Sequence, residues 1–291
     1  MRKLLVTDID GTLAHGDNIP DGVVMACDAL RAGSWDIAVA TGRILASARR
    51  HISAVGAVPQ AILYDGARIM HSGTGKEIWG EKLAPLAVEE ILGTALSSPA
   101  DIQVFGNETV LCRKGDCLAG KYFASLGVPV DDSLDRPMPM EGVYRIILHG
   151  DPGEMELLGE RISIALNGMA RAVLAGSGFL DILAPGVSKG AALQNLLGSM
   201  PDNERYMVVA AAGDHMNDLE LLRSADIAVT MSDAPPPLLE IADIVLPSAS
   251  EQGFSRILAP LENALGAYVS RCGKRDPARV GGALHDLQVR P

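Results

Sequence analysis

Short apolar runs alternate with helix-like stretches over the first 66 residues of the chain. In residues 21–32, for example, Val24, Cys27 and Leu30 recur at the spacing of one helix face. The alternation predicts strands at residues 4–6, 36–40 and 60–66, separated by helices at 21–32 and 44–55. Because each strand is joined to the next through a helix, the pattern is typical of a parallel sheet covered on both faces.

The same alternation returns towards the end of the chain. It predicts helices at residues 190–200 and 217–225, and strands at 206–214, 226–231 and 243–247. We therefore expect one α/β sheet that takes its strands from both the early and the late part of the chain.

The middle of the chain has a different pattern, with helices set among strand pairs that favour an antiparallel arrangement. We predict helices at residues 86–96, 117–126 and 153–166 and strands at 102–106, 109–113, 143–150, 170–176 and 179–186. A loop with three prolines should fill residues 128–139. The expected organisation is a core at 1–80 and 185–270, an inserted α+β domain at 81–184 and a C-terminal tail at 271–291.

Composition narrows the possible functions. The chain has 291 residues, a formal net charge of −11 and a pI of about 5.0, so it should repel nucleic acid and anionic membranes. No apolar run is long enough for a membrane span or a secretory signal. The four cysteines form no CxxC pair, which favours free thiols over a zinc site. We expect a soluble cytoplasmic protein, a monomer or a weak homodimer.

Polar residues follow three of the predicted parallel strands, at the edge where such sheets bind ligands. They are Asp8 and Asp10 after the first strand, Thr41 and Gly42 after the second, and Asp214, Asn217 and Asp218 after the strand at 206–214. An aspartate in such a place is usually a turn or cap residue. Several carboxylates together repel one another unless a cation lies among them, and oxygen ligands suit Mg²⁺.

Four motifs in order along the chain carry a resemblance: "DIDGT" from Asp8, "ATGR" with Thr41, "SKG" with Lys189, and "GDHMND" ending at Asp218. Together they resemble the haloacid dehalogenase superfamily of phosphohydrolases. The inserted segment is similar to the type C2B cap of the Cof-like subgroup (type IIB). The resemblance implies a Rossmann-like parallel-sheet core, an inserted α+β cap, and Mg²⁺-dependent hydrolysis of a small phosphomonoester, most readily a sugar phosphate.

The resemblance also implies roles for single residues. Asp8 would attack phosphorus and form an aspartyl-phosphate, Asp10 would be general acid and base, and Lys189 would neutralise the transferred group. The residues expected at the metal are Asp8, Asp10 through its backbone carbonyl, Asp214 and Asp218. The residues expected at the phosphate are Thr41, Gly42, Lys189 and Asn217.

Two positions depart from the family pattern. Asp65 stands where the subgroup often has Asn; it either makes a turn or adds a carboxylate to the cleft. His215 lies beside a metal-ligand candidate, and we favour a packing or supporting role because a site of hard oxygen ligands needs no imidazole.

The cap should select the substrate. Its candidates for substrate contact are Arg113, Arg145, His149 and Asp181. Few aromatic residues are available there to stack on a nucleobase, which favours a sugar phosphate. Two other hypotheses are a phosphomutase or phosphotransferase of the phosphomannomutase type and a non-catalytic phospholigand-binding protein.

Overall fold

The computed structural model describes residues 2–106, 109–114, 120–174 and 178–272. Its larger sheet contains β1 (Lys3–Thr7), β2 (Trp35–Ala40), β3 (Gln60–Leu63), β4 (Arg68–His71), β5 (Glu77–Gly80), β12 (Val208–Gly213), β13 (Ile227–Met231) and β14 (Ile244–Leu246). The strand order is β14-β13-β12-β1-β2-β3-β4-β5. Pairing from β14 to β3 is parallel, which confirms the predicted α/β sheet.

The larger sheet ends in an antiparallel hairpin that the sequence pattern did not predict. Strand β4 pairs antiparallel with β3, and β5 pairs antiparallel with β4. The third predicted strand is also shorter than expected, because Tyr64–Gly66 leaves the strand as a turn of 3-10 helix. That turn reverses the chain and allows β4 to return beside β3.

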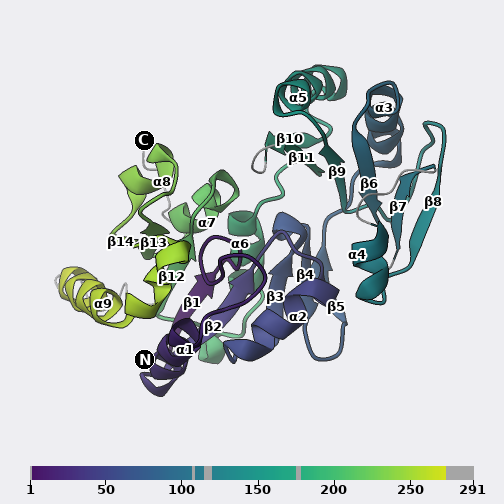
Figure 1. Ribbon diagram of the computed structural model, residues 1–291. Coiled ribbons are helices and arrows are strands. Elements are labelled where there is room, and N and C mark those ends of the chain that lie inside the picture. The colour runs from purple at the N-terminus through teal and green to yellow at the C-terminus, as the bar shows by residue number, and fades with distance from the viewer. Residues whose placement is uncertain (1, 107–108, 115–119, 175–177, 273–291) are drawn as a thin grey trace.

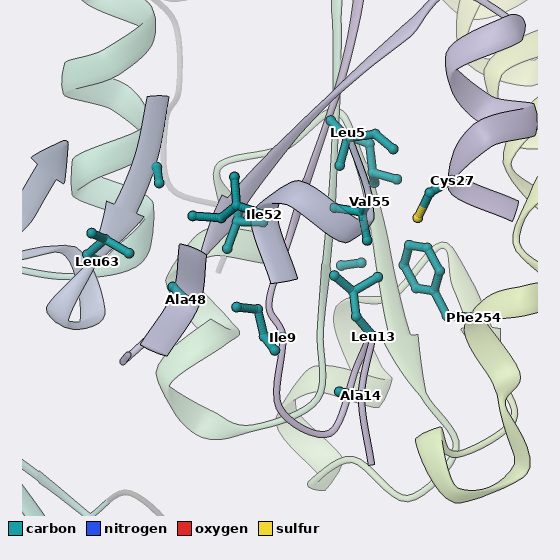
Figure 2. Close-up of a cluster of buried hydrophobic side chains, with 14 of the residues drawn as sticks. Leu5, Ile9, Leu13, Ala14, Cys27, Ala48, Ile52, Val55, Leu63 and Phe254 are labelled. Carbon is teal, nitrogen blue, oxygen red and sulfur yellow. The ribbon is translucent and has the colours of Figure 1, made fainter. Parts of the chain in front are cut away.

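Helices cover both faces of the larger sheet. They are α1 (Asp21–Ala32), α2 (Leu45–Ala54), α6 (Lys189–Gly198), α7 (Leu219–Arg223), α8 (Pro236–Ile241) and α9 (Leu258–Cys272). On one face, Leu5 of β1 packs in a cluster with Cys27 of α1 and Phe254, as Figure 2 shows. On the other, Leu4 and Val6 pack in a cluster with residues of α6, α7 and α8. Burial of a side chain such as Leu5 stabilises the fold by about 1.5–3 kcal/mol.

The smaller sheet belongs to the middle of the chain. It contains β6 (Asp101–Phe105), β7 (Val110–Arg113), β8 (Val130–Leu134), β9 (Arg145–His149), β10 (Arg171–Leu174) and β11 (Phe179–Leu183). The order is β10-β11-β9-β6-β7-β8. Helices α3 (Pro85–Ala95) and α5 (Pro152–Leu166) pack against one face of it, on the side away from the larger sheet (Figure 1). We call this part the cap and the part built on the larger sheet the core.

The cap confirms the inserted α+β arrangement with two corrections. The predicted proline-containing loop holds β8, which pairs in parallel with β7. The predicted helix at 117–126 is present as α4 (Gly120–Ser125), which ends one residue earlier than predicted, and residues 117–119 lie outside the described chain. Both predicted pairs, β6 with β7 and β10 with β11, are antiparallel. The domain boundaries themselves stay a prediction.

Three smaller expectations can be compared with the structure. Cys27 is free and buried, but Cys112 is disulfide-bonded, so the expectation of free thiols is wrong for Cys112. Helix α9 continues to Cys272, so the predicted tail begins as helix, and residues 273–291 lie outside the described part. Within the described part, no helix combines the length and the apolar character that a membrane span requires.

Candidate active site

The structure brings the predicted polar residues of the core together at the carboxyl ends of its strands. Asp8 follows β1 and is 5% exposed, and its N–H extends the pairing with β12 by donating to the carbonyl of Ala212. Thr41 follows β2 and is fully buried. Since β1 and β2 are parallel neighbours, both residues leave the sheet at the same edge.

Three carboxylates meet at this edge. Asp8, Asp214 and Asp218 each offer an oxygen, and these oxygens lie within 4.8 Å of one another. We call these residues the acidic triad. Close packing around them requires glycine: a Cβ at Gly11, where φ is +77°, would lie 2.1 Å from Asp214 Oδ2, and one at Gly213 would lie 2.4 Å from Asp218 Cβ.

Lys189 supplies positive charge to the acidic triad. It is the first residue of α6, after the N-cap Ser188, and is fully buried. Its Nζ lies 2.7 Å from Asp218 Oδ1 and 3.1 Å from Asp8 Oδ1. Lys189 is therefore not one of the solvated lysines common on protein surfaces.

The pKa shifts indicate that the positive charge of Lys189 does not fully compensate the negative charge of the acidic triad. Burial raises the pKa of Asp8 well above its ordinary value, and the neighbouring carboxylates add to this increase against the effect of Lys189. Burial, followed by Asp218, raises the pKa of Asp214 to about 7. Burial alone would lower the pKa of Lys189, but its carboxylate neighbours raise it instead.

The donor set of the acidic triad fits a magnesium ion. All of its ligand atoms are hard carboxylate oxygens, which Mg²⁺ prefers. A further observation supports the fit: Asp8 Oδ1 is a buried side-chain oxygen that lies 3.1 Å from Lys189 Nζ but accepts no hydrogen bond in the structure. A divalent cation would relieve the repulsion that raises the pKa values of Asp8 and Asp214.

The Asp10 side chain is not part of the acidic triad. It is about half exposed and forms a two-pronged ion pair with Arg43, in which Nε and Nη2 donate across 2.8 and 2.5 Å. Arg43 comes from the "ATGR" motif, and its own N–H donates to Thr41 Oγ1. The motif thus connects the phosphate-binding candidates with the second aspartate of "DIDGT", a contact that sequence spacing did not predict.

Asp65 both makes a turn and adds a carboxylate to the site. It lies in the turn of 3-10 helix after β3, is 4% exposed, and accepts a hydrogen bond from Asn217 Nδ2 at 2.8 Å. Arg145 of the cap reaches it, with Nη2 at 2.9 Å from Asp65 Oδ2, and also pairs with Asp181. This contact between core and cap was not predicted.

The remaining cap candidates do not join this group. Arg113 donates to three backbone carbonyls at the end of α3, those of Leu96, Ser98 and Ala100. His149 stacks on Phe179 with ring centroids 4.2 Å apart, at the far end of β9 from Arg145. This pair does not test the expectation that few aromatic residues are available to stack on a nucleobase, because the cap residue that reaches the core, Arg145, lies at the other end of β9. In the core, the backbone N–H of His215 donates a hydrogen bond to Asp218 Oδ2 and so helps to orient that carboxylate.

Two cavities lie outside the acidic triad. One of about 790 Å³ is lined by residues of α1 and the start of β2, including Trp35 and Asp36, at the opposite end of the sheet. Asp36 there pairs with Arg2. The other, of about 240 Å³, lies between core and cap and has Ile44 and Tyr64 among its lining residues.

Comparison with known proteins agrees with this geometry. A family model described as haloacid dehalogenase-like hydrolase matches residues 5–258. An HMP-PP phosphatase of Cronobacter sakazakii is 30% identical over 82% of this chain and 87% of its own length. The HMP-PP phosphatase of Klebsiella pneumoniae is 29% identical over the same shares of the two chains.

Solved structures share the fold. A haloacid dehalogenase-like hydrolase from Bacteroides thetaiotaomicron superposes with a TM-score of 0.73 at 20% identity, over 88% of this chain and 98% of its own. A sugar phosphatase of HAD subclass IIB gives a TM-score of 0.72 at 20% identity, over 88% and 97%. With the core, the inserted cap and the family match together, the chain belongs to the haloacid dehalogenase-like hydrolases.

Proposed function

We propose that this protein is a Mg²⁺-dependent phosphatase that hydrolyses a small-molecule phosphomonoester through an aspartyl-phosphate on Asp8. The observation that carries the proposal is the buried Asp8 carboxylate, 3.1 Å from the Lys189 ammonium and grouped with two other carboxylates. The names of the two enterobacterial relatives, both phosphatases, support the reaction type.

Asp8 attacks phosphorus in line, so that an Asp8–phosphorus bond forms as the bond to the leaving oxygen breaks. Lys189 offsets negative charge on the transferred group. Thr41 and the Gly42 N–H bind phosphate oxygens close to the start of α2, and Asn217 adds a donor. Water then attacks phosphorus and releases phosphate, which returns Asp8 to its free form.

Asp10 moves the protons in both steps. It gives a proton to the leaving oxygen in the first step and takes one from the attacking water in the second. The proton taken in the second step replaces the one given in the first, so Asp10 ends each turnover in the protonation state in which it began. Arg43 donates to both oxygens of the Asp10 carboxylate and so fixes its position beside the loop that holds Thr41 and Gly42.

Asp8, the backbone carbonyl of Asp10, Asp214 and Asp218 would hold Mg²⁺. When bound, the ion supplies the positive charge that lets a carboxylate nucleophile approach an anionic phosphoryl group. The acidic triad keeps these carboxylates close together, and Thr12 fixes the orientation of Asp214 by donating a hydrogen bond to its Oδ1 at 2.9 Å.

The substrate we propose is a small polar phosphoester, most readily a sugar phosphate. The test is phosphate release with Mg²⁺ from a panel of sugar, nucleotide and cofactor phosphates, with and without EDTA. We expect release that EDTA abolishes and that is fastest with a sugar phosphate. Full activity in EDTA would contradict the metal assignment, and a cofactor or nucleotide phosphate as the best substrate would contradict the substrate class.

A phosphomutase is the second candidate, because such enzymes share a similar nucleophile motif and cap type. A mutase retains the phosphoryl group and needs a sugar-bisphosphate activator. Phosphate release without that activator supports the phosphatase, whereas isomerisation of a sugar phosphate that depends on the activator supports the mutase.

A further inference from the structure

A buried guanidinium of the cap lies against the phosphate-binding edge of the core. Arg145 is the first residue of β9 and is 7% exposed. Its Nη1 donates to the backbone carbonyl of Gly42, and its Nη2 lies 2.9 Å from Asp65 Oδ2. The cap therefore reaches the loop after β2 and the turn after β3 through one side chain.

The cap itself holds this guanidinium in place. Asp181 on the adjacent strand β11 is 2% exposed and accepts from Arg145 Nε at 3.0 Å and from Nη2 at 2.5 Å. All three guanidinium nitrogens thus have partners within the protein. This arrangement argues against our expectation that Arg145 and Asp181 contact the substrate, and it indicates a positioning role instead.

Asp65 joins that guanidinium to the catalytic ammonium. Its Oδ1 lies 3.8 Å from Lys189 Nζ, while its Oδ2 faces Arg145. The carboxylate is held there by backbone that non-glycine residues rarely adopt, with φ of 54° at Tyr64 and 52° at Asp65. It also packs on Gly42, where a Cβ would lie 2.8 Å from Asp65 Oδ2.

The charges around Lys189 show what Arg145 contributes. Asp65 lies beside two cations, Arg145 and Lys189, and Lys189 also pairs with Asp8 and Asp218. Without Arg145, the Asp65 carboxylate would therefore compete with Asp8 and Asp218 for Lys189. Arg145 supplies a second positive charge beside Asp65, which it shares with Asp181. Burial alone would raise the pKa of Asp65, but Arg145, followed by Lys189, holds it below the ordinary value, so the carboxylate stays ionised.

We propose that Arg145 is a positioning residue that neutralises Asp65 and fixes the Gly42 carbonyl, and so leaves Lys189 to Asp8 and the phosphoryl group. The cap would thereby complete the charge balance of the core site when the two parts are in contact. This inference rests on the proposed phosphatase function, since it assigns Lys189 to the transferred phosphoryl group. It also accounts for an arginine beside position 65, because a buried carboxylate, unlike an amide, needs a counter-charge.

The test compares four variants by steady-state kinetics: Arg145→Met, Asp65→Asn, the two combined, and Arg113→Met as a matched cap control. We expect Arg145→Met to lower kcat by about 10- to 100-fold with KM within about threefold, since a misplaced group costs this much. In the double variant the uncompensated Asp65 charge is gone, so kcat should recover by about tenfold or more over Arg145→Met. Arg113→Met should leave kcat and KM unchanged.

Two results would overturn the proposal. If Arg145→Met raises KM strongly at constant kcat, Arg145 binds substrate. If adding Asp65→Asn gives no recovery, the two charges do not act through each other. Because Arg145→Met leaves buried carboxylates unpaired and can fail to fold, the double variant and Arg145→Lys, which keeps the charge and should retain more activity than Met, are measured with it.

A binding measurement separates this inference from the proposed function. Titration calorimetry with inorganic phosphate and Mg²⁺ reports on Lys189 without turnover. We expect Arg145→Met to weaken phosphate binding by about tenfold and the double variant to restore it, whereas equal binding in all variants would overturn the inference. If the wild type binds phosphate but releases none from any substrate, the proposed function fails and this comparison still decides the role of Arg145.

Discussion

The core and the cap differ in how their buried charged side chains are compensated. On the core side, the acidic triad surrounds a single ammonium, that of Lys189, and the pKa values of Asp8 and Asp214 are raised. On the cap side, Arg145 has a two-pronged partner in Asp181. The core edge is thus a group of carboxylates that a metal cation would complete, while the cap guanidinium has a partner within the protein for each of its nitrogens, which fits a positioning role.

The largest effect should come from the nucleophile of the core. We expect Asp8→Asn to lower kcat for phosphate release by at least about 1,000-fold, because the amide cannot form the acyl-phosphate intermediate. The measurement is steady-state phosphate release with Mg²⁺. Since Asn has nearly the shape of Asp, an unchanged circular dichroism spectrum would show that the loss is chemical. Unchanged activity would contradict the catalytic assignment.

The cap pair can be probed through pH. Burial raises the pKa of Asp181 to about 6, above the value of about 3.9 expected in the unfolded chain. The folded state therefore prefers the protonated carboxyl, and its stability contribution is present below about pH 4 and is lost as the pH rises to about 6. Relative to Asp181→Asn, the wild type should lose up to about 3 kcal/mol of unfolding free energy over this range. Urea unfolding of both proteins at several pH values gives the difference, and parallel pH curves would contradict it.

Magnesium should stabilise the core side alone. At a concentration about 100 times its dissociation constant, Mg²⁺ should add about 2.7 kcal/mol to the free energy of unfolding and raise Tm by several degrees. Asp214→Asn should abolish the shift, and Asp181→Asn in the cap should keep it. Because the pKa of Asp214 is about 7 without metal, the shift should be larger at pH 8 than at pH 6. If Mg²⁺ stabilised the Asp214→Asn variant as much as the wild type, the assignment of the acidic triad as the metal site would be wrong.

The smallest effect on catalysis should come from replacing Arg113, whose contacts lie within the cap. Its guanidinium donates to backbone carbonyls at the end of α3, which otherwise lack helical partners. We expect Arg113→Met to lower the free energy of unfolding by about 1–2 kcal/mol without a change in kcat or KM. A raised KM in this variant would restore Arg113 as a substrate contact.

Much of the fold could be predicted because apolar periodicity follows burial. Strand β1 is buried on both faces, and its continuous apolar run indicated this. The β4–β5 hairpin and β8 were missed for a different reason. Strands β4 and β8 carry polar residues, and their pairing depends on a turn at Tyr64–Gly66 and on the neighbour β7, which local sequence does not contain.

The contacts of the candidate site likewise include some that local sequence predicts and some that it does not. The acidic triad could be predicted because parallel strands end at a common edge, so Asp8 and Asp214 meet there whatever the loops do. The contact between Asp65 and Arg145 could not, because it depends on how two sheets approach each other. Arg113 and Arg145 both lie on predicted cap strands, and only the packing shows that one donates to carbonyls at the end of α3 and the other contacts the core.

The strand order of the core has a consequence for how the protein is made. Strand β1 lies between β2 and β12, so the carboxylates of Asp8 and Asp214 belong to neighbouring strands that are separated by the whole cap. During synthesis β1 must keep one edge unpaired until β12 has been made, and contacts so distant in sequence form slowly. A nascent chain therefore cannot assemble the acidic triad before β12 has been made. A product truncated before β12 would expose the unpaired edge of an apolar strand, which is prone to aggregation.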